Sequence, residues 1–130
     1  MSYYEKEIMV NMDVKSFANA DEVKKPDKTL AQIINFGDVK ITKLELEPGW
    51  RWSECIKPVV GTESCQAGHV GVVTHGKMKA IHNDGTEIEY AAGDAYFIAP
   101  GHDGWVVGDE KLIGYEFTVG SKDFGPWTSK

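Results

Sequence analysis

Short segments in which apolar and polar residues alternate constrain the fold of this chain more than any other feature. The clearest runs from Val39 to Leu46, where apolar side chains alternate with charged or polar ones over eight residues. A period of two is typical of a β-strand with one face in water. Glu47-Pro48-Gly49 follows, and Pro and Gly both favour a turn there. The sequence therefore predicts a strand over 39–46 that ends in a turn.

Similar segments recur along the chain, separated by turn-forming residues every eight to twelve positions. Asn83-Asp84-Gly85 is a hairpin signal, and residues Lys57 to Gly68 are rich in turn formers. No segment of useful length has a helical period. The pattern predicts an all-β, single-domain antiparallel β-barrel or jelly roll with very little helix. Its further strands are Thr29 to Asn35, Val70 to Val73, Lys77 to His82, Thr86 to Tyr90, Ala95 to Ile98, Trp105 to Val107 and Lys111 to Val119.

The chain is expected to divide into three parts. Residues 1–28 are mostly polar and predict an N-terminal arm, which lays one added strand on the body and is anchored by Phe17. Residues 29–119 form the barrel, and 120–130 form a C-terminal tail in which Phe124 and Trp127 fold back. A chain of 130 residues is long enough for one core, burying roughly two thirds of its unfolded surface.

Charge and composition limit the classes of partner that this chain is expected to bind. Fourteen basic against twenty acidic residues give a net charge of −6, which disfavours nucleic acid and anionic lipid surfaces. No apolar run approaches the ~20 residues needed to span a bilayer, so a cytoplasmic protein is expected. Two cysteines in a reducing compartment are expected to be free thiols or metal ligands.

The segment from Gly93 to Gly104 resembles the second sequence motif of the cupin superfamily. That motif reads Gly, five residues, Pro-x-Gly, two residues, His, and here Gly93 is followed after five residues by Ala99-Pro100-Gly101. Ala99 stands where Pro is usual, Gly104 stands where His is usual, and His102 lies two positions early. The resemblance implies a cupin barrel with a degenerate metal-binding motif.

The first cupin motif is matched less closely. It reads Gly, five residues, His-x-His, three or four residues, Glu, six residues, Gly. Gly76 matches its last Gly, which puts His69 at the usual Glu. Counting forward from Gly49 puts Cys55 and Lys57 at the His-x-His pair. Counting backward from His69 instead puts Glu63 and Cys65 there. We favour the forward count, with Pro58 to Gly68 as an enlarged turn. From Pro48 to Trp105 the chain also resembles a group of small bacterial and archaeal cupins of unassigned function.

The resemblance implies a pocket inside the barrel and candidate ligands for a metal. Imidazole and thiolate suit zinc, iron or copper, so these are the candidate cofactors. Cys55 is equally well explained as a small buried apolar residue, and Arg51 either receives a ligand carboxylate or is solvated. The candidate metal ligands are His69, His102, Cys55 and Cys65, and the candidate pocket residues are Trp50, Trp52, Trp105 and Glu63.

Two functions fit this sequence. One is a sensor-like or storage-like cupin that binds a transition metal, a small-molecule ligand, or both. The alternative is a metal-dependent cupin enzyme, an oxygenase, isomerase or lyase, acting on a small metabolite. A structural dimer without a site is a third interpretation. Family analogy predicts a homodimer in each case.

Overall fold

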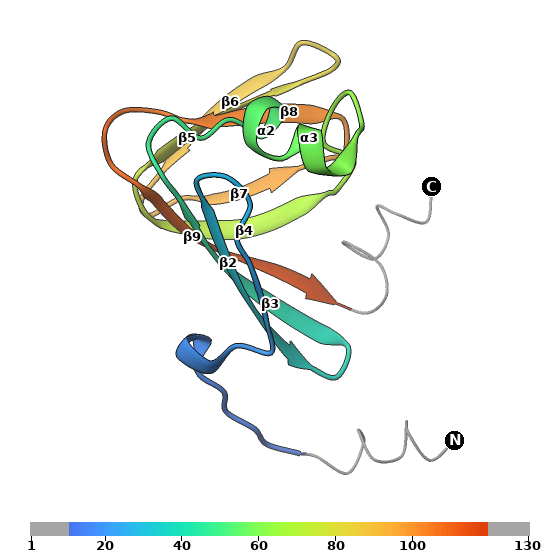
Figure 1. Ribbon diagram of the computed structural model, residues 1–130, viewed down its shortest axis with the longest axis vertical. Coiled ribbons are helices and arrows are strands. Elements are labelled where there is room, and N and C mark those ends of the chain that lie inside the picture. The colour runs from blue at the N-terminus through green and yellow to red at the C-terminus, as the bar shows by residue number, and fades with distance from the viewer. Residues whose placement is uncertain (1–10, 120–130) are drawn as a thin grey trace.

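Two antiparallel sheets form the body of the protein in the computed structural model, which describes residues 11–119 (Figure 1). One sheet has six strands in the order β1-β2-β3-β9-β4-β7, and the other has three in the order β6-β5-β8. The predicted all-β jelly roll is confirmed. The elements are η1 (Phe17–Asn19), β1 (Glu22–Lys24), β2 (Thr29–Phe36), β3 (Val39–Leu46), α2 (Trp52–Cys55), α3 (Lys57–Val60), β4 (His69–His75), β5 (Lys77–His82), β6 (Glu87–Ala91), β7 (Ala95–Ile98), β8 (His102–Val106) and β9 (Leu112–Val119).

The strands follow local sequence patterns closely. β2 and β3 pair along their whole length, from Thr29 opposite Leu46 to Phe36 opposite Val39. Gly37 takes a φ of +58° in the tight turn between them, a conformation that glycine adopts without strain. β3 then pairs with β9, and β9 with β4, so strands that are distant in the sequence lie side by side.

The second sheet departs from the expectation at β8. The sequence predicts a loop over Pro100 to Gly104, but β8 begins at His102, which pairs with His82 of β5. Cys65 also forms an isolated bridge with His102 from the other side. These long-range partners supply the hydrogen bonds that a glycine-rich segment needs to become a strand.

The expected turn region over Lys57 to Gly68 contains a short helix, and another precedes it. Trp52 and Cys55 are buried three residues apart, on one face of α2. Pro58 stands in the first turn of α3, and Gly61 ends that helix with a φ of +81°. Figure 1 shows both helices near β8 at one end of the barrel.

The described part of the N-terminal arm, residues 11–28, adds an edge strand to the six-stranded sheet. β1 pairs with β2, and Gln32 donates a hydrogen bond to the Phe17 carbonyl at 3.0 Å. The Phe17 ring makes an edge contact with Tyr115 at 5.5 Å between centroids. Phe124 and Trp127, expected to fold back, lie outside the described residues, as do 1–10 and the rest of 120–130. The three-part division of the chain stays a prediction.

Candidate metal centre

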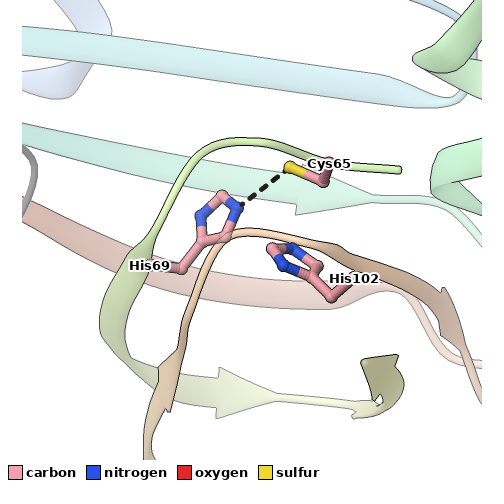
Figure 2. A group of neighbouring side chains, drawn as sticks. All are labelled: Cys65, His69 and His102. Atoms are coloured by element: carbon pink, nitrogen blue, oxygen red, sulfur yellow. Dashed lines mark hydrogen bonds between the residues drawn. The ribbon is translucent and has the colours of Figure 1, made fainter. Parts of the chain in front are cut away.

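Three side chains with metal-binding atoms meet inside the barrel. Cys65 lies on the bridge to β8, His69 is the first residue of β4, and His102 is the first residue of β8. One ligand atom from each lies within 4.8 Å of the other two. Figure 2 shows the two imidazoles and the thiol directed toward one another. Three segments distant in sequence thus contribute to one point.

The main chain fixes the relative position of two of these residues. The Cys65 N–H donates to the His102 carbonyl at 2.7 Å, and the Cys65 carbonyl accepts from the His102 N–H at 3.3 Å. The same carbonyl also accepts from the Gly101 N–H at 2.6 Å. Because backbone bonds set this register, the thiol and the His102 ring are held together independently of their side-chain contacts.

Each imidazole uses Nδ1 for an orienting bond. His102 Nδ1 lies 2.9 Å from the Ala99 carbonyl, which can only accept, so this nitrogen carries the proton. His69 Nδ1 lies 2.7 Å from Glu116 Oε1, and its Nε2 lies 3.5 Å from Cys65 Sγ. In both rings Nε2 is therefore the nitrogen available to a metal, an arrangement typical of metal-binding histidines.

Glu116 is held in turn by Tyr96. The Tyr96 hydroxyl donates to Glu116 Oε2 at 2.7 Å, across Gly71, which pairs with both residues. A Cβ at Gly71 would lie 2.8 Å from the Tyr96 hydroxyl and 2.4 Å from the Tyr115 carbonyl oxygen. The missing side chain therefore makes room for this hydrogen bond, and both carboxylate oxygens of Glu116 have protein partners.

Without a metal these groups form a chain of alternating charges. Burial disfavours a thiolate at Cys65, but hydrogen bonds from His102 and His69 outweigh burial and lower the thiol pKa to about 6. Burial also disfavours a charged His69, but the Glu116 carboxylate and the bond to Cys65 raise the imidazole pKa to about 10. Burial would raise the pKa of Glu116, yet the charge of His69 brings it below its usual value. A proton is thus held between Cys65 and Glu116.

A cavity of about 550 Å³ lies beside the three residues, and all three line it. Much of its wall is apolar and comes from both sheets and from α2. Leu46, Met78 and Leu112 line its interior, and each is less than a tenth exposed. The dimensions are those of a small-molecule pocket.

The structure brings some of the predicted site residues together and separates others. Cys65, His69 and His102 form the group, which contains the cysteine of the backward count. Cys55 is buried elsewhere, with its Sγ 3.7 Å from Asp27 Oδ2. Cys55 is therefore not part of the group formed by Cys65, His69 and His102.

Two of the predicted pocket residues line the cavity and two do not. Trp50 and Trp52 line the cavity. Trp105 does not line it and instead stacks under the Arg51 guanidinium, at 4.3 Å from the ring centroid. The Glu63 side chain is 96% exposed and pairs with Lys57 on the surface, so it lies away from the site.

Two residues of the site, Glu116 and Tyr96, were not predicted. The signal for Glu116 was present, because it shares the parity of Leu112 and Gly114 in β9, and both of these are buried. An acidic residue on the inner face of a strand needs a partner, and here the partner is His69.

The donor set fits a divalent transition metal. One thiol and two imidazole nitrogens are typical ligands of zinc, iron and copper. Ligand atoms on one tetrahedral zinc lie about 3.5 Å apart, given bonds of about 2.0 to 2.3 Å. Separations of up to 4.8 Å would contract to that value through small side-chain rotations.

Solved structures with the same architecture decide the fold family. The chain aligns with the oxalate decarboxylase of Lactobacillus farciminis, in its formate complex, with a TM-score of 0.58 over 92% of this chain at 18% identity. It also aligns with a cupin-like protein of Thermotoga maritima, with a TM-score of 0.50 over 70% of this chain at 18% identity. The chain has the cupin fold. This confirms the resemblance found in the sequence.

The chain spans a minor part of the decarboxylases that it matches. It covers 38% of the Lactobacillus enzyme and 28% of oxalate decarboxylase from Bacillus subtilis, for which Mn(II) centers are described. It covers 68% of the Thermotoga protein. No protein-family model matches this chain, and no curated protein does either. Among the described residues, no helix has the length and hydropathy to cross a membrane.

Proposed function

We propose that this cupin binds one divalent transition metal through Cys65, His69 and His102, in a sensor-like or storage-like role. The proposal rests on one observation, the three donor atoms within 4.8 Å of one another at the wall of a cavity. Nδ1 of each imidazole is already held, by Glu116 or by a backbone carbonyl. Such orienting bonds favour metal binding because the rings need little reordering.

Zinc is the metal that this donor set supports best. The Bacillus subtilis decarboxylase has Mn(II) centers, but manganese favours oxygen ligands, whereas a thiolate with two imidazoles favours zinc, iron or copper. A bound metal would supply a Lewis-acid point to which a ligand oxygen or sulfur could bind. Cys65 would supply the negative charge, and Glu116 would orient His69.

Elemental analysis of purified protein tests the proposal, with matched variants on the same chain. We expect close to one zinc per chain in the wild type and little or none in His69→Ala. His75 lies exposed at the other end of β4, so His75→Ala should keep full zinc. Cys65→Ala should lose zinc, and Cys55→Ala should retain it. Less than a tenth of an equivalent of zinc, iron or copper after each is offered in turn would refute the proposal.

A metal-dependent enzyme is the second candidate. Three protein ligands with a cavity beside them are typical of catalytic metal sites, which keep a coordination position for water or substrate. Oxygen uptake by iron(II)-loaded protein with a panel of thiols, phenols and small acids tests the oxygenase form. Absence of uptake throughout, with iron bound, would favour the sensor or store.

Two further expectations stay predictions. The first is a homodimer, which a monomer mass in light scattering would contradict. The second is a cytoplasmic location, which fractionation of the native cells would test.

A further inference from the structure

The cavity interior is suited to an apolar ligand. Leu46, Met78 and Leu112 are exposed by 4%, 6% and 3%, and Trp50 and Trp52 add aromatic surface to the wall. Apolar volume of this size gains free energy when an apolar molecule replaces the water in it. A volume of about 550 Å³ accommodates on the order of ten to twenty non-hydrogen atoms.

Most polar side chains on this wall already have protein partners. Thr29 Oγ1 accepts a hydrogen bond from the Trp50 indole N–H at 2.9 Å. Gln66 donates to the Ser64 carbonyl and hydroxyl oxygens, and Glu116 is held by His69 and Tyr96. A ligand rich in polar groups would have to break these bonds.

The cavity also has few lysine or arginine side chains that could bind an anion. Arg51, the sequence candidate for a ligand carboxylate, does not line it, because the guanidinium pairs with Asp103 at 3.2 Å and stacks on Trp105. Among the described residues that line the cavity, Lys24 is the one lysine or arginine, and it is exposed. Away from the metal centre, a carboxylate in the interior would lose its hydration without gaining a lysine or arginine partner, and Glu116 would add a second negative charge to the wall.

The Tyr90 hydroxyl is an uncharged donor on the wall. Tyr90 lines the cavity, is 7% exposed and stacks on Tyr96 at 4.5 Å between centroids. None of the hydrogen bonds found within residues 11–119 uses its hydroxyl, and no fully buried side-chain oxygen or nitrogen there lacks a partner. The hydroxyl therefore keeps contact with solvent-accessible space. Burial and the Glu116 charge raise the pKa of Tyr90, so it stays a neutral donor.

We propose that the cavity binds an uncharged, largely apolar small molecule of on the order of ten to twenty non-hydrogen atoms with one polar end. The polar end meets the metal held by Cys65, His69 and His102, so this part rests on the function proposed above. The apolar body fills the space between the tryptophans and the Leu46–Met78–Leu112 wall. Because Arg51 is paired with Asp103, it does not provide a cationic partner for an anionic ligand in the pocket.

A pair of probes that match in shape and differ in charge tests the proposal. 2-Naphthol is uncharged at pH 7 and 2-naphthoate is an anion, and both should quench the fluorescence of Trp50 and Trp52 on binding. We expect naphthol to bind at least tenfold more tightly than naphthoate to metal-free protein, and zinc to tighten the binding of naphthol further. Naphthoate binding as tightly as naphthol, or binding of neither probe below about 1 mM (about −4 kcal/mol), would overturn the proposal.

Variants connect the binding to this cavity. Ala80 lines it and is 3% exposed, so Ala80→Phe should abolish naphthol binding, and thermal unfolding shows whether the barrel has folded. Val23 is 50% exposed on β1 and lies off the cavity, so Val23→Phe is the matched control. If Ala80→Phe does not fold, Tyr90→Phe should still weaken the binding of naphthol by about threefold to tenfold, which is the effect of one lost hydrogen bond. Unchanged binding in Tyr90→Phe and in any folded Ala80→Phe would overturn the assignment.

The outcomes separate this proposal from the metal proposal. If zinc does not bind but the metal-free protein prefers naphthol, the ligand class stands and the metal function fails. If zinc binds stoichiometrically and naphthoate binds more tightly than naphthol, the metal function stands and the ligand class fails.

Discussion

Replacing Glu116 by Gln isolates the contribution of one charge to the candidate metal centre. Glu116 Oε1 lies 2.7 Å from His69 Nδ1, and Oε2 accepts from Tyr96 at 2.7 Å. Glutamine has the same shape, its amide oxygen still accepts from His69, and its amide N–H groups can donate to the tyrosine oxygen. The barrel should therefore fold, while the negative charge behind His69 is lost.

The expected effect follows from the role of Glu116 as the orienting partner of a ligand. Removing such a partner typically reduces metal affinity by about 10- to 100-fold, which is about 1.4 to 2.8 kcal/mol. Tyr96→Phe keeps the charge and removes one hydrogen bond to it, so its effect should be smaller. Glu89→Gln makes the same chemical change on the surface of β6, where Glu89 pairs with Lys77, and should leave zinc affinity unchanged.

Zinc dissociation constants from competition with a chelating dye at pH 7 measure these effects, and thermal unfolding confirms that each variant is folded. A folded Glu116→Gln protein that binds zinc within twofold of wild type would refute the role given to Glu116. An equal loss in Glu89→Gln would show that the effect is one of overall charge.

Three further predictions follow from the same contacts. Gly71→Ala places a Cβ against backbone oxygen and should lower the free energy of unfolding by about 1 to 3 kcal/mol in urea titrations; an unchanged midpoint would contradict the close packing. Asp103→Ala removes the acceptor of the Ser53 N–H, at 3.1 Å, and should cost about 1 kcal/mol in the same assay, where a stable variant would show that this bond does not hold α2. In metal-free protein, His69 has a pKa raised from 6.5 to about 10, so its stabilising effect is complete below pH 6.5 and lost as the pH rises through about 10. The lowered pKa of Glu116 gives an effect present above pH 4.5 and lost in acid, so melting temperature should fall on both sides of this window in wild type and change less with pH in His69→Ala.

Local patterns were enough for most of the fold because alternation and turn residues act within a few positions. The strand over 39–46 was predicted with its observed bounds. The two short helices were missed because each is four residues long, too short for a helical period to register.

The site depended on contacts between distant segments, which the sequence does not display. Motif counting favoured Cys55, from the forward count, over Cys65, from the backward count, whereas in the structure Cys65 lies beside His69 and His102 and is bridged to His102. His102 looked like a loop residue because its strand partners lie about twenty and about forty positions earlier in the chain. The inward position of Glu116 could have been predicted from alternation in β9 alone. Its role in the site, however, comes from pairing with His69 across the β4–β9 register.

The Cys65–His102 bridge has a consequence for how this protein can change over evolutionary time. Since Cys65 is anchored to β8 by main-chain bonds, the preceding stretch from Lys57 to Thr62 can gain or lose residues without altering where the thiol lies. Substitutions and insertions there would reshape the entrance beside Val59 and Val60, which line the cavity yet are 73% and 54% exposed. A chain with a different spacing between Gly49 and His69 could therefore keep the Cys65–His69–His102 group in place and admit different molecules to the cavity.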